Sequence, residues 1–228
     1  MAKLAKGDFA KIEFTGKRSS DGHVFDTTSE AAAKDAGLAR PGARYGPVLV
    51  VVGKGMTIAG IDEALDGMDV GETKAISVPP EKAYGLRSPA LVRVIPLSEF
   101  RKRDVAPYPG LVIEIDNRSA LVKSVNSGRV VVDLNHPLAG ETLSFDVKVA
   151  DRVEGTESRA KALAENGPLK DAEHKFTDGK LDVAVAANDK PESAEYFVAK
   201  NAFIGAVRSL LPEVKQVTFR ETYTLKAE

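Results

Sequence analysis

GKGMTIAGIDEALDGMDVGETKAISVPPEKAYG, residues 53–85, combines a short helix, two tight turns and a strand in one continuous stretch. Ile61, Leu65 and Met68 recur at a spacing that places apolar side chains on one face of a helix. Gly67 follows as a helix stop. The charged residues of this helix that we expect to face water are Asp62, Glu63 and Asp66.

A strand is expected directly after this helix. Residues 69–72 predict a turn, and residues 73–78 alternate polar and apolar side chains as a half-buried strand does. Pro79 and Pro80 end that strand. The glycines at the start of the stretch belong to neither of the glycine-rich phosphate-binding patterns, so the sequence does not indicate a nucleotide site.

Short motifs follow one another in a specific order along this part of the chain. They are Phe14-Thr15-Gly16, Asp21-Gly22 with Phe25-Asp26, Gly53, Ile58 with Gly60, Asp69-Val70-Gly71, Ala83-Tyr84-Gly85 and Phe145-Asp146-Val147. In order and spacing they resemble the FK506-binding protein (FKBP) family of peptidyl-prolyl isomerases. The resemblance implies an α+β fold, in which an antiparallel sheet wraps around a short helix, and an activity that needs no cofactor.

Composition narrows the classes of partner. The chain has 228 residues, a net charge of −1 and no cysteine, which argues against nucleic acid binding, disulfides and thiol catalysis. It has no apolar run long enough for a signal peptide or a membrane span. We therefore expect a cytoplasmic protein with no membrane partner.

Residues 1–52 predict strands and one short helix. Phe9 to Phe14 and Val24 to Asp26 flank a strong turn signal and predict a hairpin. Residues 29–36 (SEAAAKDA) predict about two helical turns capped by Ser29, although a solvated connector explains them equally well. Residues 47–52 form a β-branched run, typical of a strand buried on both faces.

About fifty residues separate Gly85 from Asn135-His136-Pro137-Leu138-Ala139-Gly140. Residues 90–95 predict a strand, residues 97–101 one helical turn, and residues 111–115, 120–125 and 130–134 three further strands of a small antiparallel sheet. The position resembles that of the insert-in-flap module of SlyD-type FKBPs. Residues 87–135 are therefore expected to form a chaperone domain between the FKBP segments 1–86 and 136–153.

Residues 154–228 change in composition and predict a C-terminal β-α-β type domain. A helix is expected from 156 to 165, ended by residues 166–168 (NGP), followed by a strand at 181–186, a helix at 192–211 and a strand at 217–225. The segment resembles the C-terminal extension of long-type archaeal FKBPs. Two strands and one long apolar helix are too few to cover both faces of a sheet. This unit should therefore dock on a second copy, giving a homodimer, or on the chain's own FKBP domain.

Rotation about an X-Pro bond needs no nucleophile, because the barrier comes from amide resonance. An apolar cavity that favours the twisted imide is sufficient. By resemblance to FKBPs, the catalytic residues would be Phe14, Phe25, Asp26, Tyr84 and Phe145. Substrate would be bound by Val48, Thr57, Ile58, Ile61 and Leu138. Taken singly, each aromatic is also explained by ordinary core packing, and Asp26 by a turn.

The chain departs from the family pattern at the pocket. It has no tryptophan, so Ile61 stands where the family places one on the pocket floor, and Phe14 stands where tyrosine is usual. Thr57 and Ala59 also differ from the usual pattern before the helix. We expect these changes to weaken binding of FK506-like macrolides more than isomerase activity.

The three histidines, His23, His136 and His174, lie far apart and lack metal-ligand spacing, so no metal site is predicted.

Two functions are compatible with the sequence. In the first, an isomerase acts on unfolded polypeptides that contain X-Pro bonds, and apolar residues of the insertion hold them. In the second, a holdase or scaffold retains the fold and catalyses little. The candidate chaperone surface comprises Leu91, Val94, Ile95, Tyr108, Leu111 and Ile113.

Overall fold

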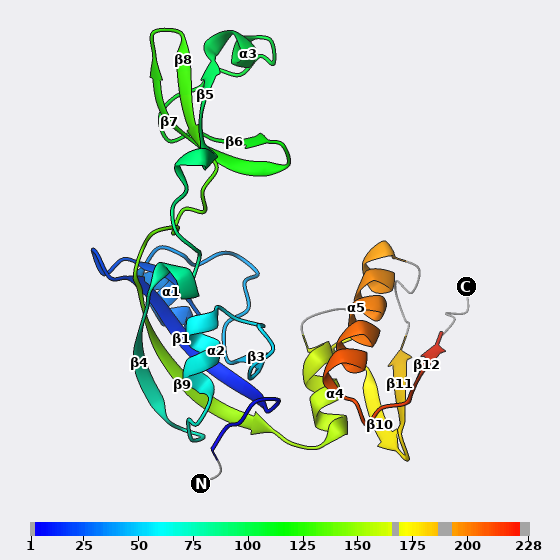
Figure 1. Ribbon diagram of the computed structural model, residues 1–228. Helices are drawn as coiled ribbons and strands as arrows, with labels where there is room; N and C mark the ends of the chain where they lie inside the picture. The colour runs from blue at the N-terminus through cyan, green and yellow to red at the C-terminus, as the bar shows by residue number, and fades with distance from the viewer. Residues whose placement is uncertain (1–2, 166–168, 187–192, 224–228) are drawn as a thin grey trace.

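The computed structural model describes residues 3–165, 169–186 and 193–223, which form three separate sheets (Figure 1). The first sheet has the order β2-β1-β9-β4, with β3 paired to β1. The second sheet has the order β5-β8-β7-β6, and the third has the order β10-β11-β12. Helices or helical turns accompany each sheet.

The first sheet is antiparallel and is built from segments far apart in sequence. Its strands are β1 (Phe9–Arg18), β2 (Val24–Thr27), β3 (Val48–Val51), β4 (Thr73–Val78) and β9 (Leu143–Val153). In β9, buried Leu143, Phe145 and Val147 alternate with residues that are at least partly exposed. This period of two turns one face of the sheet toward the core. The predicted hairpin and the strand at 73–78 are confirmed.

Helix α2 (Ala59–Leu65) packs against β4 and β9 through buried Ile61 and Leu65. Glycine is needed at position 60, because a Cβ there would lie 2.4 Å from Cγ1 of Val78. Asp62 has a role that the sequence did not predict. Its carboxylate accepts hydrogen bonds from the amides of Gly53 (2.8 Å) and Gly55 (3.1 Å), and so holds the turn before the helix instead of facing only water.

Helix α1 (Glu30–Asp35) confirms the short helix predicted after β2. The hydroxyl of Ser29 accepts from the amide of Ala32 at 3.3 Å, which is the expected N-cap interaction. A 3₁₀ turn, η1 (Pro80–Lys82), follows β4 and leads into Tyr84.

The second sheet belongs to residues 87–135, called the insertion below. It comprises the 3₁₀ turn η2 (Pro89–Leu91), β5 (Val92–Pro96), α3 (Leu97–Arg101), β6 (Val112–Ile115), β7 (Arg118–Asn126) and β8 (Arg129–Asp133). The strand expected from residue 90 begins only at Val92, because Pro89 starts a 3₁₀ turn. Asp116 and Asn117 have φ values of 51° and 58°, as a two-residue hairpin turn requires.

The insertion has a small apolar core of its own. Its buried residues are Phe100, Ala120, Val122, Val130, Val132 and Leu134. Figure 1 shows the second sheet standing apart from the first sheet, at the end of two connecting segments.

A polar clasp joins these two segments. Asp133, only 3% exposed, pairs with the half-exposed Arg87 and accepts from the side-chain amide of Asn135 at 2.7 Å. Asn135 also bonds Ser88 twice: its Oδ1 accepts from the Ser88 amide at 2.8 Å, and its Nδ2 donates to the Ser88 carbonyl at 3.0 Å. The clasp satisfies a buried carboxylate that would otherwise be costly.

Residues 154–228, called the C-terminal unit below, contain one strand more than the sequence predicted. The described elements are α4 (Thr156–Ala164), β10 (Glu173–Thr177), β11 (Lys180–Ala186), α5 (Ala194–Leu210) and β12 (Gln216–Thr222). The missed strand, β10, pairs antiparallel with β11, which is central and parallel to β12. The predicted helix stop at 166–168, the helix start at Glu192 and the strand end at Leu225 lie outside the described residues.

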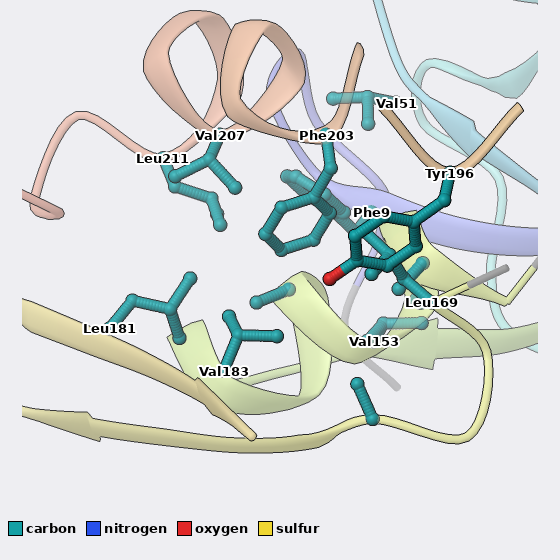
Figure 2. Packing of buried hydrophobic residues seen from close by; sticks show 14 residues of the cluster. Phe9, Val51, Val153, Leu169, Leu181, Val183, Tyr196, Phe203, Val207 and Leu211 are labelled. Carbon is teal, nitrogen blue, oxygen red and sulfur yellow. The ribbon is translucent and has the colours of Figure 1, made fainter. Parts of the chain in front are cut away.

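The C-terminal unit shares one hydrophobic core with the first sheet (Figure 2). Phe9, Val51 and Val153 from the first sheet join the buried side chains of the unit. The unit contributes Ala160, Ala162, Ala164, Leu169, Ala172, Leu181, Val183, Tyr196, Phe203, Val207 and Leu211. The unit thus docks on the chain's own first sheet, which was one of the two expected arrangements.

This docking explains why β3 is buried on both faces, as its sequence indicated. Val50 packs in the core under α2, whereas Val51 points into the core shared with the C-terminal unit. Polar contacts border the shared core: Lys11 pairs with Glu165 at 2.8 Å, and the guanidinium of Arg159 lies 5.2 Å from the centroid of the Phe9 ring. Across the described ranges, no helix is long and apolar enough to cross a membrane.

Candidate active site

Phe145, near the start of β9, is the centre of an aromatic cluster. Its ring meets Phe25 edge-on, with centroids 5.7 Å apart at 90°, and Phe14 at 6.3 Å and 62°. Phe25 in turn meets Tyr84 edge-on at 6.4 Å and 80°. The structure therefore brings together all four aromatic residues that the sequence put forward as catalytic.

The close approach of these rings depends on Gly16. Gly16 lies opposite Phe145 in the pairing of β1 with β9. A Cβ at this position would lie 2.6 Å from Cε1 of Phe145 and 2.8 Å from Cζ of Phe25, closer than real Cβ contacts. The absence of a side chain at residue 16 leaves the space that the two rings fill.

A hollow of about 430 Å³ lies beside this cluster. It is lined by Arg18, His23, Phe25, Asp26, Tyr84, His136, Pro137 and Leu138. Four apolar or aromatic side chains, those of Phe25, Tyr84, Pro137 and Leu138, converge there with four polar or charged ones. Of the predicted site residues, Phe25, Asp26, Tyr84 and Leu138 line the hollow directly.

The remaining predicted residues do not line the hollow. Ile61 is buried in the apolar core of the first sheet, and Phe14, Val48 and Ile58 pack against that core. Phe14 was expected on the pocket wall, but it lines a different hollow, together with Thr28 and Tyr45. The reason is that the ring of Phe145 contacts both Phe14 and Phe25 and fills the space over Gly16.

Thr57 and Ile58 form the turn that enters α2, and both are half-buried. The Ile58 carbonyl accepts from the amides of Ile61 and Asp62, both at 3.0 Å. Within the ranges that the structure describes, the Ile58 amide donates no hydrogen bond. A backbone donor is therefore available at the start of this helix.

The phenol of Tyr84 is neutral at physiological pH. Burial raises the pKa of Tyr84, and the negative charge of Asp26 on the same hollow raises it further. The hydroxyl therefore keeps its proton and can donate it in a hydrogen bond.

His136 is a contact that sequence reasoning did not find, because the residue was considered only as a metal ligand. Its ring is stacked on Tyr84, with centroids 4.1 Å apart and planes 3° from parallel. Its Nδ1 accepts a hydrogen bond from the Leu138 amide at 3.1 Å, and burial lowers its pKa. The sequence could have indicated this contact, because His136 lies where the chain returns from the insertion, two residues before the predicted site residue Leu138. In the described part of the chain, no cluster of three or more candidate ligands is arranged to hold a metal ion.

The apolar surface of the insertion differs in part from the expected one. Val94 and Tyr108 are each 60% exposed, as predicted. Leu91, Ile95, Leu111 and Ile113 instead pack against the core of the insertion, because they occupy its inward-facing positions. Val112, 63% exposed on the edge strand β6, belongs to the surface in their place.

Comparison with known proteins identifies relatives for most of the chain. The family profile described as "FKBP26, IF domain" matches residues 93–138. A short-type peptidyl-prolyl cis-trans isomerase of Methanocaldococcus jannaschii is 39% identical over 148 residues, which cover 65% of this chain and 93% of the relative.

Two bacterial relatives match shorter fractions of their own length. A probable FKBP-type 16 kDa peptidyl-prolyl cis-trans isomerase of Pseudomonas fluorescens is 34% identical over 46% of this chain and 72% of its own. The SlyD isomerase of Aeromonas hydrophila is 36% identical over 65% of this chain and 64% of its own. The chain therefore belongs to the FKBP-type peptidyl-prolyl cis-trans isomerases, among the SlyD-like members that carry an insert-in-flap domain.

Proposed function

We propose that the hollow beside Tyr84 is the catalytic site at which this isomerase rotates X-Pro bonds, and that the insertion holds the unfolded chain being processed. The single observation that carries the first part is the convergence of Phe25, Tyr84 and Phe145 beside a hollow open to solvent.

The chemistry required of this site is modest. The X-Pro bond is held by amide resonance, with a barrier of about 18–20 kcal/mol. On rotation the carbonyl loses conjugation and polarity, so an apolar, water-poor enclosure favours the twisted imide over the planar one. Each tenfold gain in rate requires about 1.4 kcal/mol of such preference.

Each residue has a role suited to its place. Phe25 forms the wall of the hollow, with Phe145 behind it. Tyr84 offers its hydroxyl to a substrate carbonyl, and the unpaired amide of Ile58 offers a second donor. Asp26 lies on the lining of the same hollow.

Four apolar residues complete the enclosure, and one polar residue borders it. In this proposal Leu138 encloses the substrate together with the aromatic side chains, and Ile61 and Val48 support the site from the apolar core. Phe14 supports Phe145 through the contact between their rings. Thr57 borders the turn that presents the Ile58 amide.

Substitutions at the aromatic cluster test this assignment. Tyr84→Ala and Phe145→Leu should each lower kcat/KM on a proline peptide by about tenfold or more, because each removes part of the enclosure. Tyr45→Ala, at the separate hollow next to Phe14, is the matched aromatic control and should retain activity. Circular dichroism confirms folding. Wild-type turnover in both folded variants would reject the site.

Macrolide binding at this site is proposed to be weak. Ile61 offers a smaller floor than tryptophan would, so a rigid macrolide loses contact area that a short peptide does not need. Inhibition by FK506 in the same peptide assay measures this.

The chaperone part of the proposal rests on exposed apolar surface at the strand edges of the insertion. β5 and β6 are the two edge strands of the second sheet and carry the exposed Val94 and Val112. The backbone of an edge strand can pair with an extended polypeptide, and exposed apolar side chains can bind the apolar side chains of that polypeptide. The same surface supports the second candidate function, a holdase with little catalysis.

Replacing residues 87–135 with a short loop separates these functions. The Gly140 amide donates to the Gly85 carbonyl at 2.9 Å, so the two ends that the loop must join already lie together. Turnover of small proline peptides should stay within about tenfold, while catalysed refolding of a proline-limited protein should slow greatly. Equal losses on both would reject a separate binding role, and absence of peptide turnover in the intact chain would favour the holdase.

The domain boundaries at residues 86, 135 and 153, a cytoplasmic location and a homodimer through residues 154–228 stay predictions. Light scattering tests the homodimer. A monomer would leave docking on the first sheet as the only association of the C-terminal unit.

A further inference from the structure

The ring of Tyr84 is held between two other rings. Phe25 meets it edge-on on one side, and His136 stacks on its face at 4.1 Å. The stack joins the end of the 3₁₀ turn after β4 to the segment that returns from the insertion, two parts of the chain 52 positions apart. A side chain that lies flat on Tyr84 limits the directions in which its hydroxyl can point.

His136 is itself fixed from both sides along the chain. Asn135, directly before it, is tied to Ser88 by two hydrogen bonds and to Asp133 by two more. Two residues after it, the Leu138 amide donates to Nδ1 of the imidazole at 3.1 Å. Because Nδ1 is an acceptor in this arrangement, the imidazole is neutral and carries its proton on Nε2.

We infer that His136 is a positioning residue for catalysis: its neutral imidazole holds the Tyr84 ring so that the hydroxyl points into the proline site. The inference rests on the proposed role of Tyr84. His136 does not touch the reacting bond; it acts through the tyrosine.

Protonation of His136 should weaken this arrangement. A second N–H on the ring would face the N–H of Leu138, so the imidazole would lose its role as hydrogen-bond acceptor. The attraction between a charged imidazole and the face of the Tyr84 ring opposes this loss but is smaller. The remaining charged or titratable groups on the hollow are Arg18, His23 and Asp26. The basic groups of Arg18 and His23 disfavour a positive charge on His136, and the carboxylate of Asp26 favours it.

The direction of the pH effect follows from these contacts. Burial places the pKa of His136 below its ordinary value of 6.5, so the neutral form predominates at pH 7. We expect kcat/KM to be level near neutral pH and to fall in acid, as the imidazole gains its proton.

Three variants of His136 separate stacking from hydrogen bonding and from charge. His136→Ala removes the ring and should lower kcat/KM on a proline peptide about tenfold at pH 7. His136→Phe keeps a flat ring without a titrating group; it should recover activity to within about threefold and lose the acid limb of the pH profile. His136→Gln keeps a polar side chain without a ring and should resemble the alanine variant.

The outcomes distinguish this inference from the assignment of the site. If Tyr84→Ala retains wild-type activity, the proposed site itself fails. If Tyr84→Ala is impaired but His136→Ala is not, or if the acid limb persists in His136→Phe, the positioning role is rejected. Combining His136→Ala with Tyr84→Ala should cost little more than Tyr84→Ala alone; additive losses would show that the two residues act independently. If His23→Ala removes the acid limb, the limb belongs to His23 and the inference about the charge of His136 is wrong.

Discussion

The insertion and the C-terminal unit are both additions to the first sheet, but they are attached in opposite ways. The insertion has its own small core and is joined by two segments held by a polar clasp. The C-terminal unit has no core separate from the first sheet, because Phe9, Val51 and Val153 lie inside it.

This difference matches the two parts to different proposed roles: client binding for the insertion and structural support for the C-terminal unit. The insertion is joined to the first sheet through polar contacts, and its own apolar side chains Val94 and Val112 stay exposed. A shared apolar core instead makes two units unfold together, since neither can keep its buried surface without the other. The predictions below test this contrast, in order of decreasing effect on stability.

Phe9→Ala should have the largest effect. Phe9 is 1% exposed. It lies in β1 of the first sheet, but its side chain packs in the core shared with the C-terminal unit. Truncating a buried phenylalanine costs about 3–5 kcal/mol of unfolding free energy. Denaturant unfolding followed by probes in both parts should show one transition shifted as a whole.

The matched control for this substitution is Phe197→Ala on α5, where the ring is 52% exposed. That variant should lose less than about 1 kcal/mol. If Phe9→Ala unfolds the C-terminal unit and leaves the first sheet at wild-type stability, the shared core does not couple the two parts.

Asp133→Ala should have the second largest effect, confined to the insertion. It leaves Arg87 and the side-chain amide of Asn135 without their carboxylate partner. Because Arg87 is half-exposed, we expect about 2 kcal/mol instead of the larger cost of a fully buried pair. Hydrogen exchange should accelerate at β8 and its neighbours and stay slow in β1 and β9.

A surface ion pair in the same sheet provides the comparison. Arg93 and Asp116 pair at 2.8 Å with both side chains largely in solvent, and Arg93→Ala should change exchange rates little. Equal acceleration in β9 after Asp133→Ala would mean that the clasp supports the whole molecule, not only the insertion.

Tyr196→Phe tests a polar contact at the margin of the shared core and should cost about 1 kcal/mol at neutral pH. Burial, together with the hydrogen bond that the hydroxyl donates to Glu221 at 2.9 Å, raises the pKa of Tyr196 to about 12. The unfolded chain ionises near pH 10, so this contribution is complete below about pH 10 and is lost as pH rises toward 12.

The measurement is the unfolding free energy at pH 8 and near pH 11. The unfolding free energy of the wild type should fall more over this interval than that of Tyr196→Phe, because the variant has no titrating hydroxyl at position 196. Parallel losses in both proteins would show that Tyr196 does not carry the alkaline sensitivity.

Exposed valines should have the smallest effect on stability. Val94→Ser and Val112→Ser together should change the unfolding free energy by less than about 0.5 kcal/mol, yet slow the catalysed refolding of a proline-limited protein. Val198→Ser on α5 is the control, since Val198 is 69% exposed but lies outside the insertion. If the control slows refolding equally, client binding is not specific to the insertion.

Local patterns in the sequence predicted most of the elements. The helix around Ile61 and the helical turn at Leu97–Arg101 follow from periodicity over a few residues, and the structure confirms both. β10 was missed although Asp178-Gly179, with φ values of 47° and 77°, is a strong hairpin signal between it and β11. The strand has the sequence EHKFT, in which charged residues make the alternation of polar and apolar side chains hard to recognise.

The contacts that define the site were harder to predict, because they join distant residues. The family resemblance brought Phe25, Tyr84 and Phe145 together correctly. The stack of His136 on Tyr84 and the position of Phe14 behind Phe145 depend on how strands pack, which no local pattern encodes.

The order of strands in the first sheet has a consequence for synthesis on the ribosome. β9 lies between β1 and β4, yet it is translated after both of them and after the whole insertion. A nascent chain that ends before Leu143 therefore has a first sheet without one of its inner strands. The insertion can already fold at that length, because its sheet and its core contain only its own residues. Limited proteolysis of ribosome-arrested chains should find residues 87–135 protected at lengths where β1 is still cleaved. The insertion, which we propose binds unfolded clients, would then be folded while the first sheet of the same chain is still incomplete.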